Sequence, residues 1–106
     1  MPRPIGTLGE TKFKILATIY NNESQGLPSY GYNIWLHLKK KFYLYMDKDD
    51  LRNVYRHLKE LGNLGLVETG LVQTVNGAPP RKPYILTPKG RELKYRFDKY
   101  LRVQFN

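Results

Sequence analysis

The sequence contains no cysteine, which excludes a disulfide framework and a thiolate metal site. Its only histidines, His37 and His57, show neither the spacing of metal ligands nor that of a catalytic triad. No apolar run approaches the roughly 20 residues of a membrane span, and the opening residues MPRPIGTLGE lack the apolar centre of a signal peptide. We therefore expect a cytoplasmic protein that binds no metal or cofactor and does not enter a membrane.

Acidic residues are scarce relative to basic ones. Nine Asp and Glu stand against 18 Lys and Arg, which gives a formal charge of +9 in 106 residues. Such a field favours a polyanion as partner. A hydrophobic content of 41% is too high for a disordered basic tail, so residues 1–106 should form one folded domain. No glycine loop that could cradle a phosphate and no nucleophile motif is present, so we predict no enzyme.

The stretch 47–67, DKDDLRNVYRHLKELGNLGLV, predicts the helix around which the rest is organised. A buried stripe at helical spacing is predicted at Leu51, Val54, Tyr55, Leu58 and Leu61. The opposite face should carry Asp49, Arg52, Asn53, Arg56 and Glu60. Arginine and asparagine have the shapes that read guanine and adenine edges in a major groove. A solvated amphipathic helix is the plainer alternative.

The ends of this helix carry strong local signals. Asp47 is a good N-cap, and Asp50 matches the acidic half of a capping box. Gly62 and Gly65 can supply the left-handed residue that ends the helix. The carboxylates of Asp47, Asp49 and Asp50 lack the glycine and distal glutamate of a calcium loop, so we favour capping over metal binding. As caps they stabilise the helix by about 1 kcal/mol, but they also repel phosphate.

Two helices should precede this one. Thr7 and Glu10 form a capping box for a helix to about residue 21, whose broad apolar surface predicts contacts on two sides. A second helix, 29–42, should be capped by Ser29. The lysines 39–41 in its last turn suit either the helix dipole or a phosphate clamp. Residues 42–46 are a short strand or a packed loop.

A hairpin and a last helix should follow. Strands are predicted over 66–75 and 81–86, joined at Asn76-Gly77. Pro83 cannot donate to a ladder, so its strand should present a free edge. The basic pair 81–82 suits a DNA backbone as well as a plain solvated turn. Thr87 as N-cap and Pro88 at the first position begin a single helix to about residue 105. Its apolar stripe exceeds what a small core can bury, which favours an interface between two copies.

The predicted order is helix, helix, helix, strand, strand, helix. That order describes a mainly α fold with a small β-hairpin, a winged helix-turn-helix with a C-terminal dimerisation helix. Residues 7–87 form the winged-helix core and 88–106 the C-terminal helix.

The residues also resemble the PadR-like transcriptional regulators, in a compact form with one C-terminal helix. The resemblance covers residues 8–90 and rests on three segments. These are Tyr30-Gly31-Tyr32-Asn33-Ile34; Val54-Tyr55 with Leu58, Leu61 and Gly65-Leu66-Val67; and Pro80-Arg81-Lys82 with Tyr84, Leu86-Thr87 and Gly90.

This resemblance implies a homodimer that binds operator DNA through the third helix and the wing, usually as a repressor, with a small-molecule inducer as an optional partner. The predicted contacts to double-stranded DNA are Lys48, Arg52, Asn53, Arg56, Lys59, Arg81, Lys82 and Tyr30. The predicted dimer contacts are Leu93, Phe97, Tyr100 and Leu101. Two alternatives stay open: a sequence-tolerant architectural binder of nucleic acid, and a protein-interaction module whose acidic helix start faces a partner.

Overall fold

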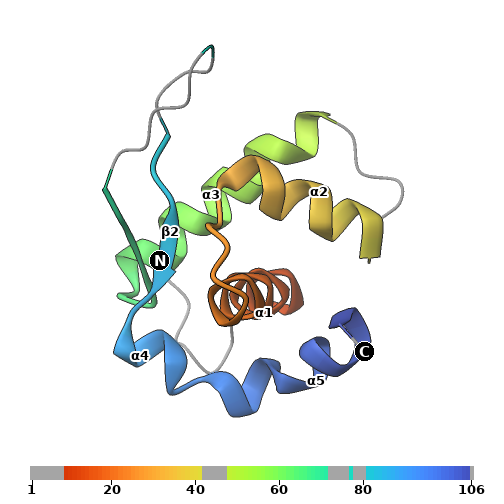
Figure 1. Cartoon of the computed structure of the whole chain (residues 1–106), viewed down its shortest axis with the longest axis vertical. Coiled ribbons are helices and arrows are strands. Elements are labelled where there is room, and N and C mark those ends of the chain that lie inside the picture. Colours follow the sequence, from red (N-terminus) through yellow and green to blue (C-terminus); the bar gives the residue numbers. More distant parts are fainter. Residues whose placement is uncertain (1–8, 42–47, 72–76, 78–80, 106) are drawn as a thin grey trace.

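The chain folds around one central helix in a computed structural model (Figure 1). The structure describes residues 9–41, 48–71, 77 and 81–105, of which 41, 48, 49 and 103–105 are described by their backbone alone. Its elements are α1 (Glu10–Ser24), α2 (Gly31–Lys41), α3 (Lys48–Asn63), β1 (Val67–Thr69), β2 (Tyr84–Leu86), α4 (Pro88–Arg91) and α5 (Lys94–Phe105). This is the winged-helix order, and it confirms the predicted mainly α fold with a small hairpin.

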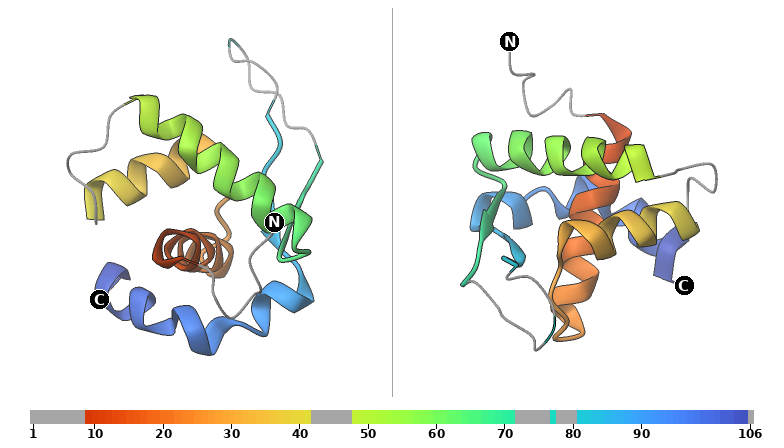
Figure 2. Two further views of the ribbon diagram at one scale, coloured as in Figure 1. Left: turned by 180° about the vertical axis from the view of Figure 1, so that it is seen from behind. Right: turned by 90° about the horizontal axis from the view of Figure 1, so that it is seen from above.

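Helix α1 runs through the middle of the molecule. Helices α2 and α3 lie on one side of it and α5 on the other, so that every residue from 12 to 19 is buried (Figures 1 and 2). The predicted contact of this helix on two sides is therefore confirmed. From α5, Phe97 is fully buried against α1, with its ring centre 5.8 Å from that of Tyr20. Lys94 and Arg96 lie over aromatic rings of α1 as well.

Both early helices begin later than their capping residues predict. The N-cap of α1 is Gly9, and among the described residues no side chain caps it; the predicted cap, Thr7, lies outside the described residues. Helix α2 begins at Gly31, and the N–H of Tyr30 donates to Asn33 Oδ1 at 2.8 Å. Ser29 is instead buried, and its hydroxyl accepts from Asn22 Nδ2. A tertiary contact has taken the hydroxyl that could have capped the helix.

Helix α3 ends in a Schellman motif. The N–H of Leu66 donates to the carbonyl of Leu61 and that of Gly65 to the carbonyl of Gly62, each at 3.0 Å. Gly65 has φ of 76°, the left-handed conformation that this motif requires. Gly62 stays helical, so of the two predicted helix-stopping glycines only Gly65 has that role.

The two strands pair antiparallel, with Val67 opposite Leu86 and Thr69 opposite Tyr84. The carbonyl of Pro83 faces β1, where it accepts from Gly70 N–H at 2.8 Å. The opposite edge of β2 is closed, because Tyr84 N–H donates to the Ser29 carbonyl at 2.7 Å. The prediction of a free edge at Pro83 is therefore wrong.

The C-terminal segment is two helices, and the prediction of one continuous helix is wrong. Thr87 caps α4 as predicted, with its hydroxyl 3.0 Å from the N–H of Gly90. After α4 the hydrogen bonds join residues three positions apart rather than four: Leu93 N–H donates to the Gly90 carbonyl, and Arg96 N–H donates to the Leu93 carbonyl. Gly90 lies against the carbonyl of Leu66, which holds α4 on the base of the hairpin. Helix α5 leaves this junction in a new direction and crosses beneath α1 (Figure 1).

Several predictions lie outside the described residues. They are the cap at Asp47, the aromatic segment 42–46, residues 72–75 of the first predicted strand, and Asn76 of the turn. Gly77 is described and has φ of 80°, as a tight turn after Asn76 would need.

Candidate nucleic-acid interface

The outward face of α3 carries the predicted base-reading residues. Arg52, Asn53 and Arg56 are exposed, and Lys59 joins them one turn later. The side chain of Lys48 lies outside the described part of the chain. Asn53 Nδ2 lies 3.4 Å from Asp50 Oδ1, so the asparagine leans toward the acidic start of the helix. The structure thus gathers a polar, cationic strip on one side of a single helix.

The inward face of α3 fixes the direction of that strip. Val54, Leu58 and Leu61 are at most 1% exposed and pack in the core with α1 and α2. An amphipathic helix held this way cannot rotate without moving its apolar stripe into water. In the view from behind, α3 lies in front, with the strands beside its C-terminal half (Figure 2).

Tyr55 departs from the predicted stripe. It is 45% exposed rather than buried, and its ring lies against Gly31 at the start of α2. A Cβ at residue 31 would overlap that ring, so glycine here allows the two helices to approach closely. Tyr55 therefore joins α3 to the N-terminus of α2 and leaves part of its ring beside the α3 strip.

A buried lysine holds α3 on α1. Lys12 Nζ, with its side chain 10% exposed, lies 2.7 Å from Glu60 Oε2 and 3.0 Å from His57 Nδ1. Because the ammonium donates to Nδ1, His57 is neutral and carries its proton on Nε2. Burial lowers the pKa of His57, and the Lys12 charge lowers it further. The hydrogen bond from Lys12 lowers the pKa of Glu60.

Sequence reasoning missed this cluster. Lys12 is separated from His57 by 45 positions, so no local pattern joins them. Glu60, predicted to face outward, is half-exposed but turns its carboxylate to Lys12. Its charge is thereby neutralised, and the cations of the α3 strip keep their field.

The returning arm of the hairpin, before β2 begins, supplies the second basic element. Arg81 and Lys82 are both exposed. The Arg81 guanidinium carbon lies 4.8 Å from the ring centre of Tyr30, which precedes α2. This brings together two predicted contact residues that are 51 positions apart in the chain. The hairpin is therefore connected to the start of α2 through these two side chains.

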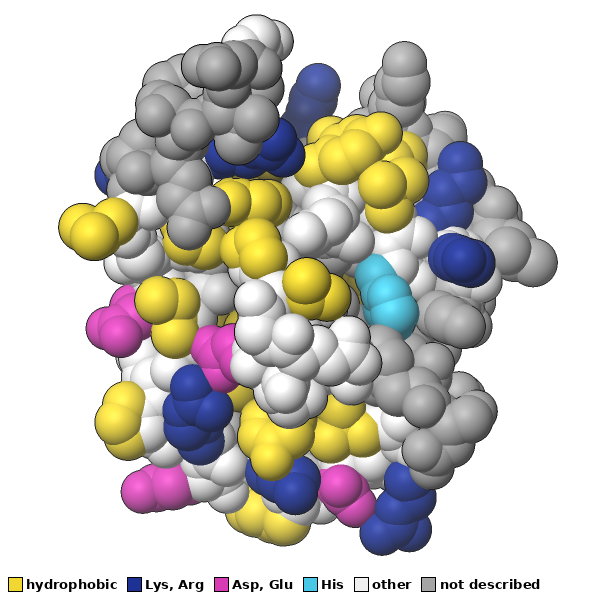
Figure 3. Space-filling model, in the orientation of Figure 1, with side chains coloured by type: hydrophobic (Ala, Val, Ile, Leu, Met, Phe, Trp, Pro, Cys, Tyr) yellow, Lys and Arg dark blue, Asp and Glu magenta, His cyan; other side chains and the backbone are white. Residues whose placement is uncertain are grey.

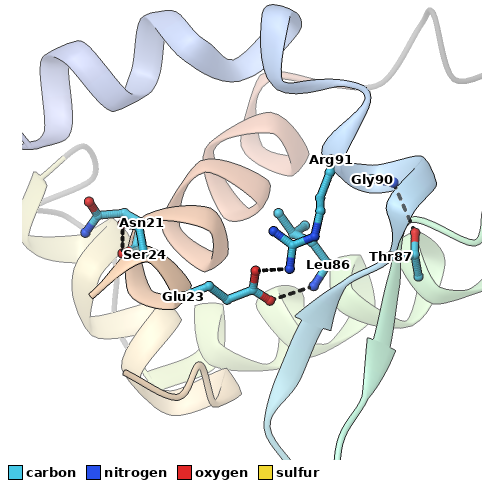
Figure 4. A network of polar contacts seen from close by, with 7 residues as sticks. All are labelled: Asn21, Glu23, Ser24, Leu86, Thr87, Gly90 and Arg91. Carbon is cyan, nitrogen blue, oxygen red and sulfur yellow. Dashed lines mark hydrogen bonds and ion pairs between the residues drawn. The ribbon is translucent and has the colours of Figure 1, made fainter. Parts of the chain in front are cut away.

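A polar network fastens the hairpin to the end of α1 (Figure 4). Glu23 Oε1 accepts from the backbone N–H of Leu86 at 3.0 Å, and its other oxygen pairs with Arg91 of α4. One carboxylate thus satisfies the outer edge of β2 and anchors α4. Beside it, Thr87 donates its hydroxyl to the Gly65 carbonyl at 2.6 Å. The long separations left no signal of this network in the sequence.

The opposite face has a different character. Hydrophobic side chains spread across its centre (Figure 3). The exposed large hydrophobic residues of the described chain include Leu27, Tyr32 and Leu36. A shallow hollow of about 700 Å³ opens between the end of α1, the following loop and β2. Tyr20 and Tyr84 line it, and burial raises the pKa of Tyr84. This hollow borders the hairpin, since Pro83, Tyr84 and Ile85 line one side of it.

Within the described residues, no three His, Asp or Glu side chains gather as a metal site would require. None of the described helices combines the length and apolarity needed to cross a bilayer.

A protein-family model matches residues 15–95, which include all of α2 to α4 and most of α1. The model is that of the transcriptional regulator PadR-like family. The chain belongs to this family. Its members are DNA-binding transcriptional regulators rather than enzymes, so the PadR-like resemblance read from the sequence is confirmed.

A solved structure agrees with this assignment. The fold resembles the crystal structure of a PadR-like transcriptional regulator from Bacillus cereus, with a TM-score of 0.63 and 24% identity. The match covers 83% of this chain and 77% of the other. At that identity the likeness establishes the winged-helix fold alone. No curated protein matched the sequence.

Proposed function

We propose that this PadR-like protein is a cytoplasmic, sequence-specific repressor that binds double-stranded DNA as a homodimer. The observation that carries the proposal is the exposed Arg52, Asn53 and Arg56 strip on a helix whose other face is locked in the core. In the proposed complex this strip, with Lys48 and Lys59, enters a major groove, because Arg and Asn match guanine and adenine edges. Arg81 and Lys82 contact the backbone beside it.

Selection from a random duplex library at near-physiological salt tests sequence reading. A repressor of this kind should enrich a palindrome with half-sites about one helical turn apart. Adding the protein should then reduce transcription in vitro from a promoter that carries the palindrome. Retention without an enriched sequence would instead identify an architectural binder. No retention would favour a protein-interaction module.

Two single substitutions separate base reading from phosphate binding. Arg56→Ala should cost about 1–3 kcal/mol at one base position, whereas Lys82→Ala should weaken all duplexes equally and lower the salt slope by about 1. Lys99→Ala is the matched control, because Lys99 is exposed on α5, across α1 from α3. Equal losses on specific and random DNA for Arg56→Ala would remove its base-reading role.

The proposed dimer uses the outer side of α5. Leu93, Tyr100 and Leu101 are half-buried and keep apolar surface for a second copy. Phe97 does not, because its own chain covers it completely. Leu101→Asp should yield a monomer in sedimentation velocity, and Tyr95→Asp is the control on the same helix, since Tyr95 is 75% exposed. A Leu101→Asp protein of wild-type mass would rule out this interface.

A small-molecule inducer would fit the hollow beside β2. Its volume of about 700 Å³ is within the usual range of ligand pockets, and it borders the strand that leads on from Arg81. A thermal-shift screen of small molecules tests this assignment. Stabilisation by a true ligand should vanish in Leu27→Trp, which places an indole in the hollow, and a hit unaffected by that change binds elsewhere.

A further inference from the structure

Arg81 stacks on Tyr30 in the absence of DNA. Its side chain is exposed and long, so in isolation it would sample many rotamers. Instead the guanidinium lies over the ring of Tyr30, with 4.8 Å between the guanidinium carbon and the ring centre. Arginine keeps its hydrogen-bond donors in the guanidinium plane when it stacks on an aromatic face. The stacked side chain can therefore still bind a phosphate.

Tyr30 is itself fixed from two sides. Its N–H donates to Asn33 Oδ1 at 2.8 Å, and its carbonyl accepts from Ile34 N–H at 2.9 Å. These two hydrogen bonds attach Tyr30 to the first turn of α2. The residue before it, Ser29, accepts from Tyr84 N–H at 2.7 Å. The ring under Arg81 is thus tied to α2 and to the returning strand of the hairpin.

The next residue, Gly31, connects these contacts to α3. Gly31 lies under the ring of Tyr55, which belongs to the same helix as Arg52 and Arg56. A continuous set of contacts therefore runs from Arg81 through residues 30 and 31 to α3. It sets the separation between the cation of the hairpin and the cations of the α3 strip.

We propose that Tyr30 is a positioning residue, which holds Arg81 at a fixed distance from α3 and makes no essential DNA contact of its own. This inference rests on the proposed function, and it replaces the direct DNA contact that the sequence predicts for Tyr30. Pre-ordering lowers the entropy lost when Arg81 binds DNA. The gain corresponds to a cation–π contact at an exposed site, a factor of about two to five in affinity.

A double-mutant cycle on the selected duplex tests the proposal. Tyr30→Phe keeps the ring and should bind as the wild type does. Tyr30→Leu should weaken binding about two- to five-fold at an unchanged salt slope, because the Arg81 charge remains. Arg81→Ala should lower that slope by about 1. In the Arg81→Ala background, Tyr30→Leu should then have no further effect. A loss of the same size in both backgrounds would overturn the proposal, because Tyr30 would then act independently of Arg81.

A readout without DNA distinguishes this proposal from the repressor hypothesis. In the free protein, the NMR signal of Arg81 Nε–H should be shifted upfield by the ring in wild type and Tyr30→Phe, and should move downfield in Tyr30→Leu. The same position in all three proteins overturns the positioning role, whether or not the protein binds DNA. A ring-shifted signal in a wild-type protein that binds no duplex overturns the repressor hypothesis, and with it any DNA role for the stack.

Discussion

Replacing Gly90 by alanine should destabilise the protein, although Gly90 lies in a helix. Alanine in place of a helical glycine ordinarily stabilises by about 0.5–1 kcal/mol, because it reduces the entropy of the unfolded chain. At Gly90 the new methyl group would overlap the carbonyl oxygen of Leu66. That oxygen is held in place, since it accepts from Thr87 N–H at 3.1 Å. Overpacking of this kind costs about 1–3 kcal/mol, so the net loss should be about 1–2 kcal/mol.

Gly62 supplies the matched control. It is exposed, it lies in α3 with a helical φ, and an added Cβ would have its nearest neighbour, the Val67 carbonyl oxygen, at 3.9 Å. Gly62→Ala should therefore stabilise the protein by about 0.5–1 kcal/mol. Replacing glycine by alanine should thus change the stability in opposite directions at these two helical positions.

Urea unfolding followed by far-UV circular dichroism measures both effects. The midpoint should fall by about 0.5–1.5 M for Gly90→Ala and rise for Gly62→Ala, with the slope m unchanged. The reasoning is refuted if Gly90→Ala unfolds at or above the wild-type midpoint. In that case α4 would not lie against the Leu66 carbonyl, and the hairpin base would be arranged differently.

Three further predictions concern single polar contacts. The pKa of His57 is lower in the folded state, so as the pH falls the unfolded chain binds the proton first. The contribution of His57 to stability should therefore be complete above pH 6.5 and should fall as the pH drops below it. His57→Gln, whose side chain can still accept a hydrogen bond from Lys12, should flatten this part of the curve in urea unfolding measured at several pH values. Glu23→Ala should lower the free energy of unfolding by about 1–3 kcal/mol, because the N–H of Leu86 loses its acceptor. Glu23→Gln keeps an acceptor oxygen and should lower it by less than about 1 kcal/mol. Equal losses in the two variants would show that the ion pair with Arg91, and not the hydrogen bond to Leu86, stabilises the fold. Thr87→Ala should lower the stability measured by thermal unfolding by about 1–2 kcal/mol, and Thr87→Ser should lower it much less. A Thr87→Ala protein as stable as the wild type would show that Thr87 does not cap α4.

The sequence by itself determined the order of elements and the character of α3. An apolar repeat at helical spacing forces one side of that helix inward, wherever the helix lies, so the outward strip of Arg52, Asn53 and Arg56 followed from periodicity alone. Backbone conformations that few residue types can adopt were also predictable from the sequence. Gly65 is left-handed, and Thr87 caps a helix that begins at a proline, because backbone sterics act within a few residues.

Only the tertiary structure decided which residues of that frame meet. Tyr55 fitted the buried stripe by spacing, yet Gly31 opens a close approach that leaves its ring half-exposed. Phe97 matched a dimer stripe, but α1 passes close enough to bury it within its own chain. The last helix divides because α4 must rest on the Leu66 carbonyl while α5 packs against α1.

The contacts that support the candidate site have the same origin. Lys12 meets His57, and Glu23 meets Leu86, across 45 and 63 positions of sequence. Neither pair has a periodicity or a motif, since hydrogen bonds between distant residues depend on where packing places whole helices. Local patterns thus determine what each element presents, and packing determines what that surface touches.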